Sequence, residues 1–98
     1  MTITKTQAGN ALTIALEGRL DTMTSPELEA ELKKNMDSAE SLTLDFSKLD
    51  YISSAGLRVL LSAHKIMSAK GGMKVTNVNE IVQEVFEVTG FADILTIE

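Results

Sequence analysis

Two adjacent serines open an apolar helical pattern in the middle of the chain. Residues 50–65 read DYISSAGLRVLLSAHK, in which Leu57, Leu60 and Leu61 recur at helical spacing. A hydroxyl at a helix start faces backbone N–H groups that lack intrahelical partners, and the helix dipole favours negative charge there. Phosphorylation of Ser54 would therefore add about two negative charges at a place where the fold tolerates them. The pattern indicates a switchable docking site.

A helix cap is the simpler role for one of these serines. Ser54 at the N-cap would be worth about 1 kcal/mol, but a cap needs only one hydroxyl. Gly56 follows in the first turn, where glycine costs up to ~1 kcal/mol relative to alanine. We therefore expect another backbone or a partner to come close to Gly56.

Catalysis by Ser54 would need a base within hydrogen-bond reach. The only histidine, His64, lies ten residues further along the same helix, about 15 Å away at about 1.5 Å per residue. This excludes a dyad within one molecule, and we expect His64 to pack at the boundary of the core. Asp21 could act as a base, but no oxyanion hole or second acid accompanies it. KGGMK lacks the spacing of a phosphate-binding loop. We expect no enzyme, no cofactor and no metal site.

The composition and net charge limit the classes of partner that this protein is expected to bind. The 98 residues suffice for one domain, and 9 basic against 14 acidic residues give a net charge of −5. The scattered lysines and few aromatic residues argue against nucleic acid, and proteins or small ligands are expected instead. No apolar run reaches the roughly 20 residues that span a bilayer, so no membrane insertion is expected. The absence of cysteine and of a signal-peptide pattern predicts a cytoplasmic protein.

Periodicity and turn residues predict the element order β-β-α-β-α-β-α-β. Ser25 and Pro26 suit a helix cap and first helical position, and Gly90 suits a helix end. Strands are expected over residues 2–7, 11–17, 41–46, 73–76 and 93–98, and helices over residues 25–36, 55–69 and 79–90. The expected inward side chains are Leu28, Leu32 and Met36 in the first helix, Leu42, Leu44 and Phe46 in the third strand, and Ile81, Val82, Val85 and Phe86 in the last helix. Gly71 or Gly72 is the expected stop of the second helix.

This alternation predicts an α/β fold with right-handed crossovers and a sheet that is parallel wherever a helix connects two strands. The loops that leave parallel strands then meet at the carboxyl edge of the sheet, where α/β folds place their sites. We therefore expect residues 21–25, 51–56 and 77–79 to be neighbours.

Three segments in this order resemble a known family. GRLDTMTSPEL, LDFSKLDYISSAGLRVLL and KGGMKVTNVNEIVQEVFEVTGF together resemble the anti-sigma factor antagonist family, whose fold is the STAS domain. The resemblance covers nearly the whole chain. It implies a single STAS domain over residues 1–98, with a mixed sheet of four to five strands packed against three or more helices.

The resemblance also implies a partner-switching mechanism. In this family the unphosphorylated antagonist binds an anti-sigma factor that is also an ATP-dependent serine kinase; phosphorylation releases the antagonist, and a serine phosphatase resets it. The target serine precedes the glycine of the S-x-G-L signature by two residues, which is Ser54 here. Ser53 is the second candidate, because it stands where familiar members have aspartate. The resemblance places the family's acidic turn residue at Asp21, which we expect beside Ser54. The partner surface that we expect at this carboxyl edge comprises Asp21, Thr22, Tyr51, Ser53, Ser54, Ala55, Gly56 and Arg58.

Two other functions fit the same residues. A STAS-like domain without the switch could serve as a scaffold or nucleotide-sensing module in a signalling or lipid-transport assembly. A hydrolase that uses Ser54 is the third hypothesis. Binding of GTP or ATP without a protein partner would favour the second, and reaction with a serine-directed probe would favour the third.

Overall fold

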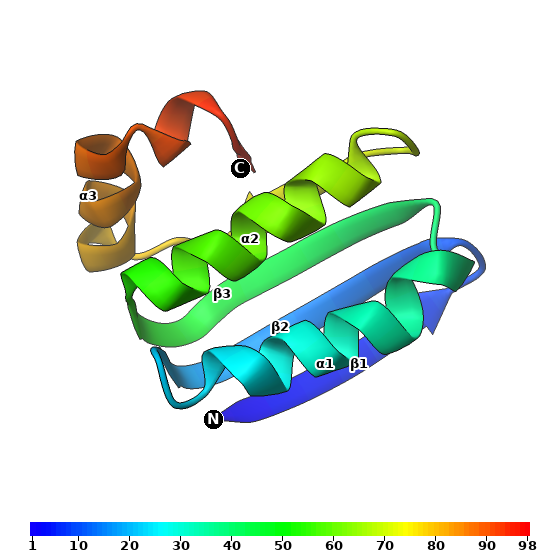
Figure 1. Cartoon of the computed structure of the whole chain (residues 1–98), viewed down its shortest axis with the longest axis horizontal. Helices are drawn as coiled ribbons and strands as arrows, with labels where there is room; N and C mark the ends of the chain where they lie inside the picture. The colour runs from blue at the N-terminus through cyan, green and yellow to red at the C-terminus, as the bar shows by residue number, and fades with distance from the viewer.

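Five strands form one sheet in the spatial order β1-β2-β3-β4-β5 in a computed structural model that describes residues 1–98 (Figure 1). β1 and β2 form an antiparallel hairpin, and β2 to β5 are mutually parallel. The strands are Thr2–Ala8 (β1), Ala11–Leu20 (β2), Ser41–Ile52 (β3), Met73–Thr76 (β4) and Thr96–Ile97 (β5). The mixed sheet and the order of elements confirm the predicted fold class.

Strand order follows chain order, and the right-handed crossovers expected between parallel strands then put all three helices on one face of the sheet. The helices are Ser25–Asn35 (α1), Ser54–Met67 (α2) and Glu80–Thr89 (α3), with short 3-10 turns at Met36–Ser38 (η1) and Phe91–Asp93 (η2). Figure 1 shows α1 and α2 side by side across the sheet, with α3 at one end of the molecule. The opposite face of the sheet is left open to solvent. A row of register partners on that face includes Thr6, Thr13, Thr43 and Thr96.

The core is a single layer of 23 side chains between the helices and the sheet. Alternate residues of β2 and β3 point into it, as the predicted strand faces require. Leu28 and Leu32 of α1 and Met36 of η1 are buried as expected. The Phe46 and Phe86 rings lie 6.5 Å apart between β3 and α3. None of the helices combines the length and the hydrophobicity that a bilayer-spanning segment needs.

β2 and β3 are longer than predicted. The pairing of the two strands contains two register shifts, one between Ala15 and Glu17 and one between Gly18 and Arg19. Each shift breaks the alternation of buried and exposed residues that marks a strand in sequence. The predicted strand therefore ended at residue 46, where the alternation stops, whereas β3 runs to Ile52.

Several helix details also differ from the prediction. Thr24 occupies the N-cap position of α1, and Ser25 is the first helical residue. α2 ends at Met67 rather than residue 69, and Gly72, with φ of 96°, is the left-handed residue that follows it. The last strand is restricted to Thr96–Ile97 because η2 occupies the preceding residues. Ile81 was predicted to face inward, but 59% of its surface is exposed.

Candidate partner-binding site

The ends of β2 and β3 bring two predicted site loops together. Leu20 pairs with Ile52, and the Ser53 backbone N–H donates a 2.9 Å hydrogen bond to the Leu20 carbonyl. Asp21 and Ser54 follow these two residues directly, so residues 21–25 and the start of α2 are adjacent, as expected. The two loops form one continuous surface at the carboxyl edge of the sheet.

The third predicted loop lies further back along β3. The Asn77 amide donates to the Asp45 carboxylate at 3.0 Å, and the Asn79 amide donates to the Leu49 carbonyl at 2.8 Å. β4 ends opposite Asp45, while β3 continues to Ile52. The expectation that three loops meet is therefore correct for two of them; residues 77–79 brace the middle of β3 instead.

The two serines occupy different positions at the start of α2. Ser53 is the N-cap residue, with extended backbone (φ −100°, ψ 176°), but its side chain makes no cap hydrogen bond. The Ser53 hydroxyl oxygen is buried and has no partner. Ser54 is the first helical residue and is exposed. The prediction that Ser54 is the cap is thus wrong by one position, and no side-chain cap covers the free amides of the first turn.

Gly56 is explained by close packing inside the molecule. A Cβ atom at this position would lie 2.8 Å from Leu20 Cγ and 2.8 Å from Ile52 Cγ1. Both neighbours are fully buried, so neither has space to move away. The expected close approach therefore comes from two strand side chains and not from a backbone or a partner. Gly56 itself is buried, and it allows α2 to pack closely against the ends of β2 and β3 beneath the site.

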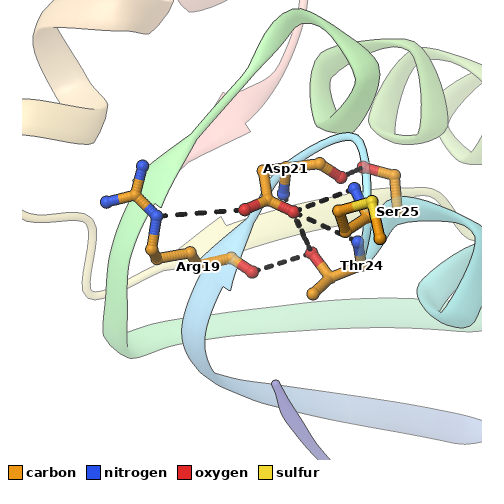
Figure 2. A network of polar contacts seen from close by, with 5 residues as sticks. Arg19, Asp21, Thr24 and Ser25 are labelled. Carbon is orange, nitrogen blue, oxygen red and sulfur yellow. Dashed lines mark hydrogen bonds and ion pairs between the residues drawn. The ribbon is translucent and has the colours of Figure 1, made fainter.

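Asp21 organises the turn between β2 and α1 (Figure 2). Its Oδ1 accepts hydrogen bonds from the backbone N–H groups of Met23 (3.0 Å) and Thr24 (3.1 Å) and from the Thr24 hydroxyl (3.2 Å). Its Oδ2 lies 3.9 Å from Arg19 Nε. These contacts, led by the Thr24 N–H, hold the pKa of Asp21 below its ordinary value. The carboxylate is therefore a fixed negative charge beside the start of α2.

The remaining predicted residues surround this turn. Tyr51 is the penultimate residue of β3 and half-buried, and the Arg19 guanidinium lies 4.6 Å from its ring centroid. Thr22 and Arg58 are exposed, and Ala55 is half-buried. Arg19 was not predicted as a site residue, since only the shifted register places it opposite Tyr51.

Other chemistry is not assembled at this surface. His64 is half-buried within α2, as expected of a boundary residue, and its Nδ1 is buried without a partner. A cavity of about 500 Å³ lies at the opposite, amino edge of the parallel strands and is lined in part by Ser41, His64 and Gly72. No group of three or more His, Asp or Glu side chains is placed to hold a metal ion. The site is an open surface built around an exposed hydroxyl at a helix start.

Comparison with known families agrees with this fold. A family model described as "Mlab, STAS domain" matches residues 3–96, and the chain therefore belongs to the STAS domain family. Among curated proteins, it is similar to the putative anti-sigma factor antagonist BtrV of Bordetella bronchiseptica. The two are 37% identical over 99% of this chain and 85% of the relative. The family predicted from the three sequence segments is confirmed.

Solved structures share the fold at low sequence identity. An anti-sigma factor antagonist from Mycobacterium paratuberculosis matches with a TM-score of 0.89 at 21% identity, over 98% of this chain and 83% of that one. The anti-sigma factor antagonist SpoIIAA in its unphosphorylated form matches with a TM-score of 0.77 at 16% identity, over 99% of this chain and 87% of that one. The phosphorylated form of SpoIIAA, a Bacillus cell fate determinant, matches with a TM-score of 0.76 at 17% identity, over 99% and 91% of the two chains.

Proposed function

We propose that this STAS domain is an anti-sigma factor antagonist whose binding to an anti-sigma factor serine kinase is switched by phosphorylation of Ser54. The observation that carries the proposal is the exposed Ser54 hydroxyl in the first turn of α2, where no side chain caps the free amides. The similarity to BtrV, which is named a putative anti-sigma factor antagonist, supports the choice of partner class.

The switch consists of a change in surface charge on a fixed scaffold. The kinase transfers the γ-phosphoryl group of ATP to Ser54 Oγ; an O–P bond forms, the hydroxyl proton is lost and ADP leaves. The added charge of about −2 is favoured by the N–H groups and dipole of α2, so the helix stays in place. The same charge alters the surface that the partner contacts, next to the Asp21 carboxylate, and the complex dissociates. A serine phosphatase restores the hydroxyl by hydrolysis of the O–P bond.

Ser54 is favoured over Ser53 by accessibility. A kinase must bring the acceptor hydroxyl in line with the γ-phosphate, which requires an exposed side chain. Ser54 is exposed, whereas the oxygen of Ser53 is buried beneath the start of α2. The proposed contact surface also includes Asp21, Thr22, Tyr51, Ala55 and Arg58, with Ser53 and Gly56 as supporting residues. Because the kinase requires ATP, we place the cycle in the cytoplasm.

The test uses the purified protein, the kinase domain encoded nearest its gene and Mg-ATP, with the product weighed by intact mass. Wild type and Ser53→Ala are expected to gain one phosphoryl group, and Ser54→Ala none. Ser54→Asp is expected to lose binding to the kinase, while Ser62→Asp, an exposed serine two turns further along α2, retains it.

Two outcomes would contradict the assignment. Labelling of Ser54→Ala together with loss of labelling in Ser53→Ala would move the site to Ser53. Equal labelling of both variants would remove the switch from this helix start altogether. Binding of ATP or GTP to the isolated domain would favour a nucleotide-sensing module instead.

A further inference from the structure

α3 carries apolar side chains on two sides. Val82 and Phe86 point into the core and are fully buried. Ile81, Val85 and Val88 recur at i, i+4 and i+7 on a different side, which we call the outer stripe. Ile81 is 59% exposed and Val88 is 80% exposed. The outer stripe and its neighbours Glu84 and Thr89 line an open groove of about 270 Å³.

Single exposed aliphatic residues are ordinary on a protein surface, but a continuous row along one helix is not. α3 packs mainly against β3 and η2, and Val82 and Phe86 are its fully buried side chains. Val85 packs partly against the edge of the core, while Ile81 and Val88 are left exposed to solvent.

Negative charge lies along one side of the outer stripe. Residues 75–98 contain five acidic residues and no lysine, arginine or histidine, so this segment accounts for the whole net charge of −5. Glu80, Glu84 and Glu87 are exposed on α3 itself. A groove with an apolar floor and an acidic rim selects a ligand with apolar anchors and positive flanks.

We propose that the outer stripe docks a basic amphipathic helix of another protein. Apolar side chains of that helix fill the groove between Ile81, Val85 and Val88, and its lysine or arginine side chains meet the glutamates of the rim. A second copy of this chain would place one acidic rim against another, and an anionic membrane surface would be repelled in the same way.

Docking at α3 does not depend on the proposed switch. α3 lies at the same end of the molecule as the start of α2 (Figure 1), but the outer stripe contains none of the residues around Ser54. If docking at α3 fails its test, the phosphorylation proposal is therefore unaffected.

The test titrates the isotopically labelled full chain with a synthetic amphipathic peptide of about 18 leucine and lysine residues, followed by NMR. Amide shifts are expected on α3 and not on α1, and a peptide with glutamate in place of lysine is expected to bind at least tenfold more weakly. Absence of binding, equal binding of the two peptides, or shifts spread over the whole molecule would overturn the proposal. Dimerisation of the free chain through α3, detected by sedimentation, would also overturn the proposal.

Variants localise the effect. Ile81→Asp with Val88→Asp is expected to weaken peptide binding at least tenfold, whereas Ile66→Asp, an exposed isoleucine near the end of α2, leaves it unchanged. Glu84→Lys is expected to weaken binding severalfold, and Glu27→Lys, on the exposed side of α1, much less. Unchanged affinity in the α3 variants would refute the outer stripe as the docking surface. Because these side chains are exposed, all the variants are expected to melt close to wild type.

Discussion

Substitution of Gly56 by alanine sets two opposing effects against each other at the start of α2. Alanine favours the helix over glycine by up to ~1 kcal/mol. The new methyl group, however, would lie 2.8 Å from Leu20 Cγ and from Ile52 Cγ1, well inside the ordinary contact distance of 3.4–4 Å. Neither contacted atom is at the tip of its buried side chain, so a rotation about the terminal bond cannot relieve the contact.

The overpacking is expected to win. Insertion of a methyl group into a well-packed core typically costs about 1–3 kcal/mol, so the net loss in the free energy of unfolding is about 1 kcal/mol. For a domain of this size that loss lowers the melting temperature by roughly 4–8 °C. Because Leu20 and Ile52 immediately precede Asp21 and Ser53, the same substitution is expected to shift the amide resonances of both site loops.

Thermal and urea unfolding of wild type and Gly56→Ala measure the effect. Leu20→Ala provides the matched background, since it removes one of the two contacted atoms; Gly56→Ala should cost less there, giving a measurable coupling between the two positions. A higher melting temperature for Gly56→Ala in the wild-type background would refute the packing argument and show that helix propensity dominates.

Two further substitutions test the supports of the site. Asn79→Ala removes the side chain that accepts from Val82 N–H and donates to the Leu49 carbonyl; a loss of about 1–2 kcal/mol in urea unfolding is expected, and an unchanged midpoint would refute it. Asp21 has a native pKa below the ordinary 3.8, so its stabilisation is present above that pH and is lost as the pH falls below it. Asp21→Asn is therefore expected to lose less stability than wild type between about pH 6 and about pH 3. Some acid sensitivity will persist, because the pKa of Asp45 is lowered too, chiefly by the Asn77 amide. An equal loss in both proteins would contradict this role of Asp21.

The sequence predicts the parts of this fold that obey a regular period. The alternation in the first half of β3 and the stripe of Leu28, Leu32 and Met36 lie where expected. The second half of β3 was missed because buried positions after Phe46 are three residues apart, at Leu49 and Ile52, rather than two. Such spacing arises from a shift in pairing with β2, and a single strand carries no record of its neighbour's register.

The place of the candidate site was predicted only in outline, because a helix start can be found from local sequence whereas contacts between strands cannot. Helix-start chemistry is local, so the two serines could be found, but their assignment to cap and first turn differs by one residue. Arg19 was missed since its contact with Tyr51 depends on the shifted register. Ile81 was placed inward because four apolar residues of α3 cover a wide arc, and only packing against β3 decides which edge of that arc is covered.

Because the helices lie on one side of the sheet, only a small share of the side chains is needed to build the core. Only 23 of the 98 side chains form the core, fewer than one in four, because the sheet has a single covered face. The threonine-lined face needs only side chains that tolerate a strand and water. Two sequences with this fold can therefore diverge until about one residue in five is identical while their backbones still superpose closely. The 21% identity and TM-score of 0.89 with the mycobacterial structure illustrate this.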